Sequence, residues 1–593
     1  MQSTMPRIPP LRYSVIAANP AAHRFTVTCT VERPDRAGQC FALPAWIPGS
    51  YLIRDFARHI VAIRAESEGK PIRLDKLDKH TWRAAPLKKP APLTVICEVY
   101  AWDLSVRGAH FDPTHAFFNG TSVFLRPLGL EASPCLVELR RPDGADFRNW
   151  RVATSLTPAT GEKGCAKQFG FGWYRADNYD DLIDHPVEMG TFTLVSFEAC
   201  GVPHHVAITG RHDCDEERLA ADLKRVCEWQ IRFFGEPAPM QRYVFLVTAV
   251  GEGYGGLEHR ASTALLCSRN DLPYKGMQGL PESYRTFLGL CSHEYFHTWN
   301  VKRIKPAAFV PYDLDRENYT TQLWAFEGIT SYYDDLALLR SGVIERKDWL
   351  DVTAKTISNV HRAPGRLRQS LAESSFDAWS KFYRPDENTP NAVVSYYAKG
   401  ALAALALDLT LRRKSAASLD DVMRTLWQRF GQTGHGVADD DVRRIAEELS
   451  GLDLKRFFAE TIHGTRDLPL KTLLSPFGVR LAWEKAKTPS LGIKTASDGN
   501  ELRLATVYDG GAAQAAGLSA GDVLVAIDGL RVTAKNLDPI LGRYQPGETL
   551  TIHAFRRDEL MTFTVVLGPH DEDSAKLTCP PTANRLRESW LGS

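Results

Sequence analysis

The chain has 593 residues, of which 44% are hydrophobic and 24% charged, a composition typical of globular proteins and unlike that of disordered chains. Its 72 Lys and Arg residues nearly balance its 71 Asp and Glu residues, so net charge favours neither nucleic acid nor an anionic membrane as a partner. A single hydrophobic core does not grow to this length, so we expect several domains.

Targeting signals and cysteine usage narrow the class further. We find no apolar run long enough for a secretory signal or for a transmembrane helix, which needs about 20 residues, and we expect a soluble cytoplasmic protein. The eleven cysteines include no C-x-x-C pair, which argues against a disulfide framework and a cysteine zinc site. We interpret most of them as buried thiols, Cys291 included.

Residues 1–178 are predicted to form a β domain, because short alternating segments such as RFTVTCTVE and LTVICEVYAW are separated by Pro and Gly turns. Over residues 216–234 the spacing of the apolar residues becomes that of a helix. The strand-like RYVFLVTAV then leads into GEGYGGLEH, which we interpret as a glycine-rich loop. These elements begin a second domain, residues 179–470, whose C-terminal half is predicted to be helical.

Two helices are predicted in the middle of this second domain. The first begins near Pro281 and ends with HEYFH, residues 293–297. The second runs from about Thr321 to Leu339, with a glycine just past its end. Later helices include NAVVSYYAKGALAALALDLTLRR, whose Ala and Leu content indicates burial.

The HEYFH segment predicts a metal site. His293 and His297 are four residues apart, so both imidazoles project from one face of a helix. Zinc suits them, because catalytic zinc sites use three protein ligands and keep a fourth place open for water. Glu294 lies between them and can act as general base on that water and then protonate the leaving amine. By chance such a motif arises in on the order of a few per cent of chains of this composition.

A third ligand is predicted in LWAFEGITSYYDD, where Glu327 stands among apolar neighbours that a solvated Glu would not need. A buried carboxylate requires a cation. We therefore predict one Zn²⁺ per chain, held by His293, His297 and Glu327.

HEYFHTWNVKRIKP followed by LWAFEGITSYY closely resembles the glycyl aminopeptidase family of thermolysin-like (gluzincin) zinc metallopeptidases. The resemblance extends over LPAWIPGSYLIRDFARH, SVRGAHFDPTHAFFNGTSVFL and GYGGLEH, and so over nearly the whole chain. It implies a multidomain α+β fold, with an N-terminal β domain, a thermolysin-like zinc peptidase domain with a helical portion, and a C-terminal PDZ domain.

The spacing between His297 and Glu327 is longer than in the wider group of thermolysin-like aminopeptidases. Glu317 would fit the shorter spacing better. Its neighbours DRENYT, however, indicate a solvated loop, whereas Glu327 stands in the matching W-x-x-E-G context. We therefore keep Glu327 as the ligand.

Two further roles are implied by resemblance to thermolysin-like aminopeptidases. GEGYGGLEH resembles their exopeptidase signature, in which Glu258 would bind the α-amine of the substrate while Gly255 and Gly256 admit an extended peptide. The alternative is an ordinary glycine-rich turn with a surface Glu. SYYAKG resembles the Y-x-K-G segment, which assigns the oxyanion donor to Tyr397, the alternative being a core tyrosine.

Other polar residues near these motifs have weaker assignments. The basic loop after HEYFH holds residues that can orient ligands or contact the peptide, although solvation explains their charges equally well. The matching segments of the β domain contain two more, for which structural hydrogen bonding is the default. The residues are Asn300, Lys302 and Arg303 in the loop, and Arg107 and Asn119 in the β domain.

Residues 471–569 contain SLGI followed by GGAAQAAGLSAGDVLVAIDG, which resembles a bacterial PDZ domain. Backbone amides of Leu491, Gly492 and Ile493 would bind a peptide C-terminal carboxylate, and the peptide would add as a strand. Substrate recruitment, docking and a spacer role stay open. The polar residues 570–593 are expected to be a loosely held tail, and deletion from residue 489 onward is expected to spare hydrolysis of small substrates.

The resemblance implies an aminopeptidase that releases small N-terminal residues, Gly and Ala, from peptides with a free N-terminus. One alternative is a PDZ-guided endopeptidase, for which Glu258 would be incidental. The other is a PDZ scaffold with a structural zinc site. Glu294 argues against the scaffold, because a structural site fills all four positions with protein ligands and needs no general base.

Overall fold

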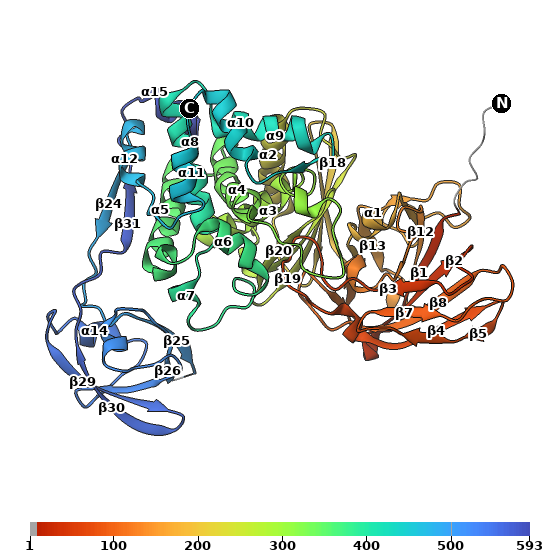
Figure 1. Cartoon of the computed structure of the whole chain (residues 1–593), viewed down its shortest axis with the longest axis horizontal. Coiled ribbons are helices and arrows are strands. Elements are labelled where there is room, and N and C mark those ends of the chain that lie inside the picture. The colour runs from red at the N-terminus through yellow and green to blue at the C-terminus, as the bar shows by residue number, and fades with distance from the viewer. Residues whose placement is uncertain (1–8, 500, 593) are drawn as a thin grey trace. The chain divides into compact units, whose positions relative to one another are not determined.

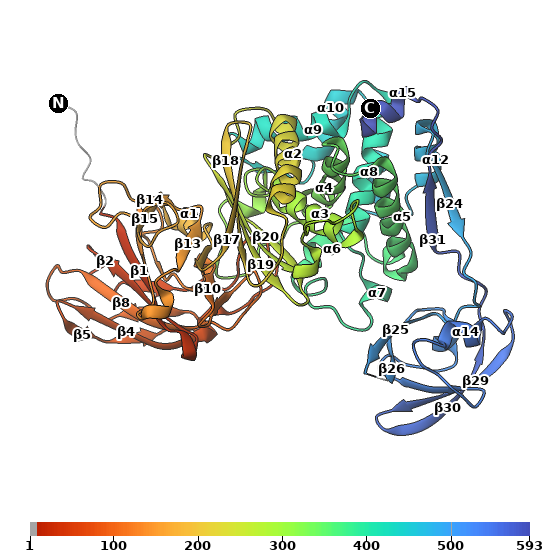
Figure 2. The same ribbon diagram turned by 180° about the vertical axis from the view of Figure 1, so that it is seen from behind.

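A computed structural model describes residues 9–499 and 501–592 (Figure 1 and, from behind, Figure 2). The chain divides into two compact units. The first holds residues up to Asn318 together with 430–436, and the second holds the remainder. The predicted α+β class with a β-rich N-terminal region is confirmed, whereas the domain boundaries at 178, 470 and 569 stay predictions.

The first unit begins with a β domain built on one large sheet. Its strand order is β14-β15-β12-β1-β2-β8-β4-β5. Alternate residues of β2, from Phe25 to Val31, are buried, as the alternating sequence predicts. The strands of this sheet are β1 (Leu11–Asn19), β2 (Arg24–Val31), β4 (Ile60–Ser67), β5 (Lys70–Ile72), β8 (Leu93–Tyr100), β12 (Cys135–Arg140), β14 (Thr157–Pro158) and β15 (Gly172–Ala176).

Two smaller sheets complete the β domain. One has the order β13-β16-β10-β9 and the other β11-β3-β7-β6. Their strands are β3 (Cys40–Ala42), β6 (Leu74–Lys76), β7 (Thr81–Ala84), β9 (Ala109–Phe111), β10 (His115–Phe118), β11 (Arg126–Pro127), β13 (Arg151–Thr154) and β16 (Val187–Gly190).

A mixed sheet with the order β17-β18-β19-β21-β20 forms the rest of the first unit. Its strands share a hydrophobic core with the β domain, to which β19 contributes Val244 and Leu246. Helices α2 (Glu216–Phe234) and α3 (Glu282–Phe296) pack on each other and on this sheet. The strands are β17 (Thr193–Ala199), β18 (Val202–Thr209), β19 (Tyr243–Val250), β20 (Tyr254–Glu258) and β21 (Ser262–Ser268).

The second unit is largely helical. The central helix α8 is buried from Lys399 to Leu411, which confirms the burial predicted from its Ala and Leu content. The helix begins only at Ala398, however. The residues just before it make contacts outside the helix, and the Val394 N–H donates to the Gln369 side chain. The helices are α4 (Ile329–Arg340), α5 (Arg346–Arg362), α6 (Leu371–Phe376), α7 (Thr389–Ala392), α8 (Ala398–Lys414), α9 (Leu419–Leu426), α10 (Asp441–Ser450), α11 (Lys455–Thr461) and α12 (Leu470–Leu474).

The PDZ-like β domain belongs to the second unit and has its own core. Its sheet has the strand order β25-β26-β27-β29-β30, so β25 lies at one end of this order. Its elements are β25 (Ile493–Asp498), β26 (Glu501–Val507), α13 (Ala512–Ala515), β27 (Val523–Ile527), β28 (Leu530–Arg531), α14 (Leu537–Leu541), β29 (Thr549–Arg556) and β30 (Glu559–Val566).

The chain returns to the helices after this β domain, so the prediction of a loosely held tail is wrong. Strand β31 (Ser574–Thr578) pairs with β24 (Arg480–Glu484), and α15 (Arg585–Leu591) follows. Trp590 is fully buried, and its Nε1 donates to the Tyr332 hydroxyl at 2.8 Å. Deletion from residue 489 onward would remove these contacts too, and its effect on hydrolysis stays a prediction.

The cysteine prediction is largely confirmed. The eleven cysteines all lie in the described part of the chain, all are free thiols, and seven are buried, Cys291 among them. No helix within residues 9–499 and 501–592 is long and apolar enough to cross a membrane.

Candidate metal and peptide site

The end of α3 brings the two predicted histidine ligands together. His293 lies in the last turn and His297 is the residue that ends the helix. Their Nε2 atoms are 3.0 Å apart, and the two rings are nearly perpendicular. The spacing of four residues therefore brings the Nε2 atoms of both imidazoles close together on one side of the helix end, as helical spacing predicts.

The tautomer of His297 is fixed by a hydrogen bond of its second ring nitrogen. Nδ1 lies 2.6 Å from the backbone carbonyl of Asn300. A carbonyl can only accept, so Nδ1 carries the proton and Nε2 presents a lone pair toward His293. Metal-bound histidines are commonly oriented by such a bond. The donor set at the end of α3 therefore fits zinc, and Asn300 contributes through its main chain.

Glu294 lies against the outermost strand of the mixed sheet. A Cβ built on Gly256 of β20 would overlap the Glu294 carboxylate, so only glycine allows the strand to pass here. Glu294, Glu258 and His297 are each at least nine-tenths buried, and one ligand atom from each lies within 4.8 Å of the others. Two carboxylates and an imidazole thus meet beside an edge strand.

GEGYGGLEH forms strand β20 rather than the predicted loop, since it pairs with β21 from Tyr254 to Glu258. β20 ends the strand order of its sheet, so its outer edge can take an added peptide strand. The alternative of a turn with a surface Glu is wrong, because Glu258 is only 3% exposed.

Two residues of the β domain contact this edge, and sequence reasoning did not assign them. A Cβ on Gly49, whose φ is +98°, would lie 2.5 Å from the Glu258 carboxylate. Arg107 Nη2 donates to the Gly256 carbonyl at 3.2 Å. Both residues lie in segments that carry the family resemblance, WIPGSY and SVRGAHF. That resemblance was the sequence signal that could have pointed to them.

Glu327 lies in the second unit, on a π-helical turn that spans Trp324–Gly328, and is 2% exposed. Single π-turns inside helices frequently occur at functional sites. A Cβ on Gly328 would lie 2.6 Å from the Cα of Gly400 in α8. The glycines of W-x-x-E-G and Y-x-K-G therefore allow these two backbones to touch.

Tyr397 directly precedes α8 and is partly exposed, whereas its neighbour Tyr396 is fully buried. Burial raises the pKa of Tyr396, and the charges of Tyr383 and Glu327 raise it further. The Tyr397 hydroxyl is 3.3 Å from that of Tyr383, a residue that sequence reasoning did not single out. Glu327 and the predicted oxyanion donor thus belong to neighbouring segments of one unit.

The remaining polar residues hold the fold together. Lys302 forms a buried ion pair with Asp184 at 2.6 Å. Arg303 donates to three backbone carbonyls, and Asn119 donates to the Val106 carbonyl at 2.6 Å. Glu317 lies in an irregular segment outside helices and strands, as its polar neighbours predict.

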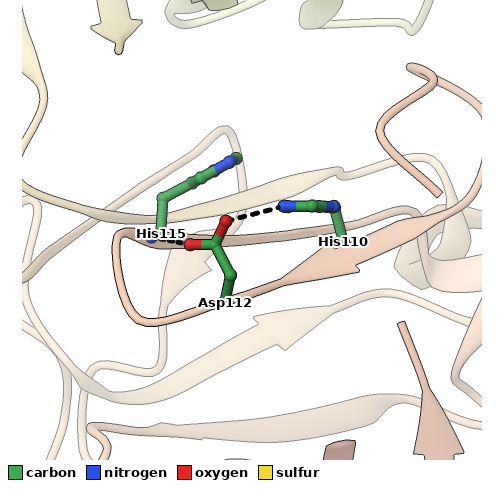
Figure 3. Close-up of side chains that lie close together, drawn as sticks. All are labelled: His110, Asp112 and His115. Carbon is green, nitrogen blue, oxygen red and sulfur yellow. Dashed lines mark hydrogen bonds and ion pairs between the residues drawn. The ribbon is translucent and has the colours of Figure 1, made fainter. Parts of the chain in front are cut away.

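His110, Asp112 and His115 form another group with metal-ligand chemistry, at the turn between β9 and β10 (Figure 3). The Asp112 carboxylate accepts from the backbone and hydroxyl of Thr114, from the His115 backbone and from His110. His115 pairs with the buried Glu188 at 3.1 Å. A cation would have to displace these bonds, so we interpret the group as a brace for the hairpin.

The PDZ-like loop contains a glycine with a left-handed backbone conformation. Gly492 has φ +69° and passes so close to Gly511 that a side chain would not fit. Its N–H donates to the Ser490 hydroxyl at 3.1 Å. Leu491 is buried, and Ile493 begins β25, the strand at the end of the sheet order.

Comparison with known proteins now places the chain. Residues 12–191 match the Peptidase M61 N-terminal domain, residues 286–403 the M61 glycyl aminopeptidase domain, and residues 489–567 a PDZ domain. The crystal structure of an aminopeptidase N family protein from Idiomarina loihiensis is 43% identical, with a TM-score of 0.94 over 98% of this chain and 100% of that one. The chain belongs to the M61 glycyl aminopeptidase family. It is a metallopeptidase, and zinc is the metal that this membership implies.

Other solved structures are more distant. An M1 zinc metallopeptidase from Deinococcus radiodurans, determined with a Tyr-Ser-Ala substrate, is 15% identical with a TM-score of 0.48, over 78% of this chain and 95% of that one. Another structure of the M1 zinc metallopeptidase from that organism is 14% identical with a TM-score of 0.49. No curated protein matches the chain.

Proposed function

We propose that this M61 protein is an aminopeptidase that hydrolyses the N-terminal bond of peptides with a free α-amine and prefers small residues, Gly and Ala. The observation that carries the proposal is the buried group of Glu258, Glu294 and His297 beside edge strand β20. It combines an anion for an ammonium, a candidate base and a metal ligand at one strand edge. The small-residue preference rests on the glycyl aminopeptidase family alone.

We assign one zinc ion per chain to His293, His297 and Glu327. The tautomer of His297 and the burial of Glu327 support this assignment. Bound zinc would polarise the substrate carbonyl and lower the pKa of a bound water.

The proton transfers are assigned to Glu294. Its carboxylate would take the proton of the attacking water and return it to the leaving amine, a pairing that a single well-placed acid–base group can perform. Tyr397 would donate a hydrogen bond from its hydroxyl to the developing oxyanion. Its partial exposure supports this role over that of the fully buried Tyr396.

Substrate position is assigned to β20 and Glu258. An extended peptide would pair with the outer edge of β20, with Gly255 and Gly256 allowing close approach. Glu258 would bind the α-ammonium through a charge-assisted hydrogen bond. The backbone at Gly49 lies directly against this carboxylate, which leaves little room for residues N-terminal to the amine.

The PDZ domain is assigned a peptide C-terminus as ligand, with the carboxylate at Leu491, Gly492 and Ile493 and the peptide along β25. The Ser490 hydroxyl now occupies the Gly492 amide. A carboxylate oxygen would replace the Ser490 Oγ as acceptor of this N–H once the serine side chain turns to another χ1 rotamer.

The decisive experiment compares Gly-Ala-Phe with its N-acetylated form, each with the native enzyme, after chelation and after zinc is restored. We expect release of Gly from the free-amine peptide alone, lost with chelation and regained with one zinc per chain. Cleavage of the acetylated peptide at equal rate would replace the proposal by an endopeptidase. Bound zinc without cleavage of either would support a scaffold.

Tyr397→Phe tests the oxyanion assignment, with Tyr396→Phe as the matched control. Removal of one oxyanion donor costs about 10²- to 10³-fold in kcat, so the first variant should lose this factor with little change in KM. The control should keep near-native kcat. Equal kcat in both variants would contradict the assignment.

A further inference from the structure

A cavity of about 220 Å³ lies within the second unit. Its walls come from α5, α8, the segment around α12 and strand β24, which also pack on one another (Figure 1). Ile357, Leu402 and Leu481 are buried apolar residues of these walls. For comparison, an apolar cavity of about 150 Å³ accommodates benzene, so this one has room for a ring or a medium-length chain.

The floor of the cavity holds an ammonium group. Lys399 is 1% exposed and lies in the first turn of α8. Within the described residues, its Nζ donates to the Arg366 carbonyl at 2.9 Å, which leaves two of its three N–H donors for another acceptor. Burial lowers the pKa of Lys399 to about 8. The charge of Asp467 at the rim opposes part of this lowering, but a buried ammonium with two N–H donors left over is still costly unless an acceptor binds them.

The rim of the cavity is partly charged and open to solvent. Asp467 is exposed and already accepts two bonds from the Arg366 guanidinium, at 2.9 and 3.4 Å. Trp483 is 36% exposed, and its ring packs on His361 at 4.3 Å between centroids. Lys471 adds an exposed cation. The one carboxylate at the rim is thus bound to an arginine.

We propose that this cavity binds an amphipathic carboxylate, with the carboxylate at Lys399 and an apolar body between α5, α8 and β24. The walls supply apolar burial for the body, and the floor supplies the only fully buried cation among the described lining residues. Medium-chain fatty acids, aromatic acids and the C-terminal residue of a peptide share this chemistry.

The site stands next to the proposed oxyanion donor, since Lys399 follows Tyr397 by two residues. It also lies at β24, from which the chain enters the PDZ-like domain. A ligand here would therefore contact both the first turn of α8 and strand β24.

The test is isothermal titration calorimetry on the full-length zinc enzyme with octanoate and phenylacetate, with octanamide as the neutral match. N-acetyl-leucine represents a peptide C-terminus and distinguishes the two sources. We expect an acid to bind at least tenfold more tightly than octanamide. Tighter binding of N-acetyl-leucine than of octanoate would assign the site to peptide C-termini, and the reverse order to free acids.

Variants locate the binding. Lys399→Met keeps an unbranched apolar side chain and should lose the tenfold preference for the acid, whereas Lys414→Met, exposed at the far end of the same helix, should retain it. Thr472→Trp, at an exposed position on the rim, should block entry without disturbing the core. Absence of binding, equal affinity for octanoate and octanamide, or acid binding that survives both cavity variants would overturn the proposal.

Discussion

Among the described residues of the first unit, histidines and acidic residues come within metal-ligand distance of one another at the end of α3 and at the β9–β10 turn. The two groups differ in the hydrogen bonds that their ligand atoms already make. At the end of α3, the Asn300 carbonyl holds the proton of His297 on Nδ1, so Nε2 points its lone pair at His293. At the β9–β10 turn, the Asp112 carboxylate accepts from four groups. Residue types and spacing are therefore a weaker guide to a metal site than the bonds that each ligand atom already makes.

Removal of one histidine from each group is expected to give the largest contrast. His293→Ala should lose zinc and all peptidase activity, because a catalytic zinc site needs three protein ligands. His110→Ala should keep one zinc per chain and near-native kcat. Metal analysis after dialysis against a weak chelator measures the zinc content of both variants, and peptidase assays measure their kcat. Full zinc in His293→Ala, or loss of zinc in His110→Ala, would reverse the comparison.

The acids of the two groups should separate activity from stability. Glu294→Gln should retain zinc and lose about 10²- to 10⁴-fold in kcat, the usual contribution of a general acid–base group. Glu188→Gln weakens the buried pair with His115 and should cost about 1–3 kcal/mol of unfolding free energy at unchanged kcat. Steady-state kinetics and urea unfolding test the two variants, and a near-native kcat in Glu294→Gln would exclude Glu294 as the base.

Glu258→Gln should lower kcat/KM for a free-amine peptide by about 10²-fold, because a buried ammonium would lose its charged partner. The acetylated peptide should stay uncleaved by both enzymes, so the loss is measured on the free-amine peptide alone. Glu317→Gln, in the irregular segment, is the control and should match the native enzyme. An undiminished kcat/KM for the free-amine peptide in Glu258→Gln would exclude the amine-binding role.

The smallest effect is expected for the free energy of unfolding at acid pH. Burial raises the pKa of Asp112, but hydrogen bonds from Thr114 and His110 outweigh it and lower that pKa to about 2. A depressed pKa stabilises the fold at every pH above the unfolded value of 3.8, and this contribution is lost as the pH falls toward 2. Asp112→Asn should therefore flatten the loss of stability between these values. An unchanged profile, measured by acid unfolding, would show that the turn does not contribute.

The sequence predicted best where one local pattern determines the outcome. The helix over 216–234 follows from its period and from Asp215, whose side chain caps the first turn. His293 and His297 needed only helical spacing. The strand at GEGYGGLEH could not be recognised, because its glycines match a turn and only pairing with β21 makes it extended.

Features that depend on distant contacts were also out of reach. The π-turn at Glu327 accompanies the contact of Gly328 with Gly400. The burial of Trp590 depends on residues about 250 positions earlier, which no local pattern reveals. Composition suggested a tail there, since polar residues surround a single tryptophan.

The paired strands β24 and β31 make the PDZ-like domain an insertion rather than an appendage. Glu484 and Ser574 are directly opposed, and opposed residues of antiparallel strands have Cα atoms about 5 Å apart. A two-residue hairpin turn can join such positions. The intervening module can therefore be excised, or exchanged for another with adjacent ends, while the helical body keeps its last strand and helix. Peptide recruitment could then be altered independently of hydrolysis.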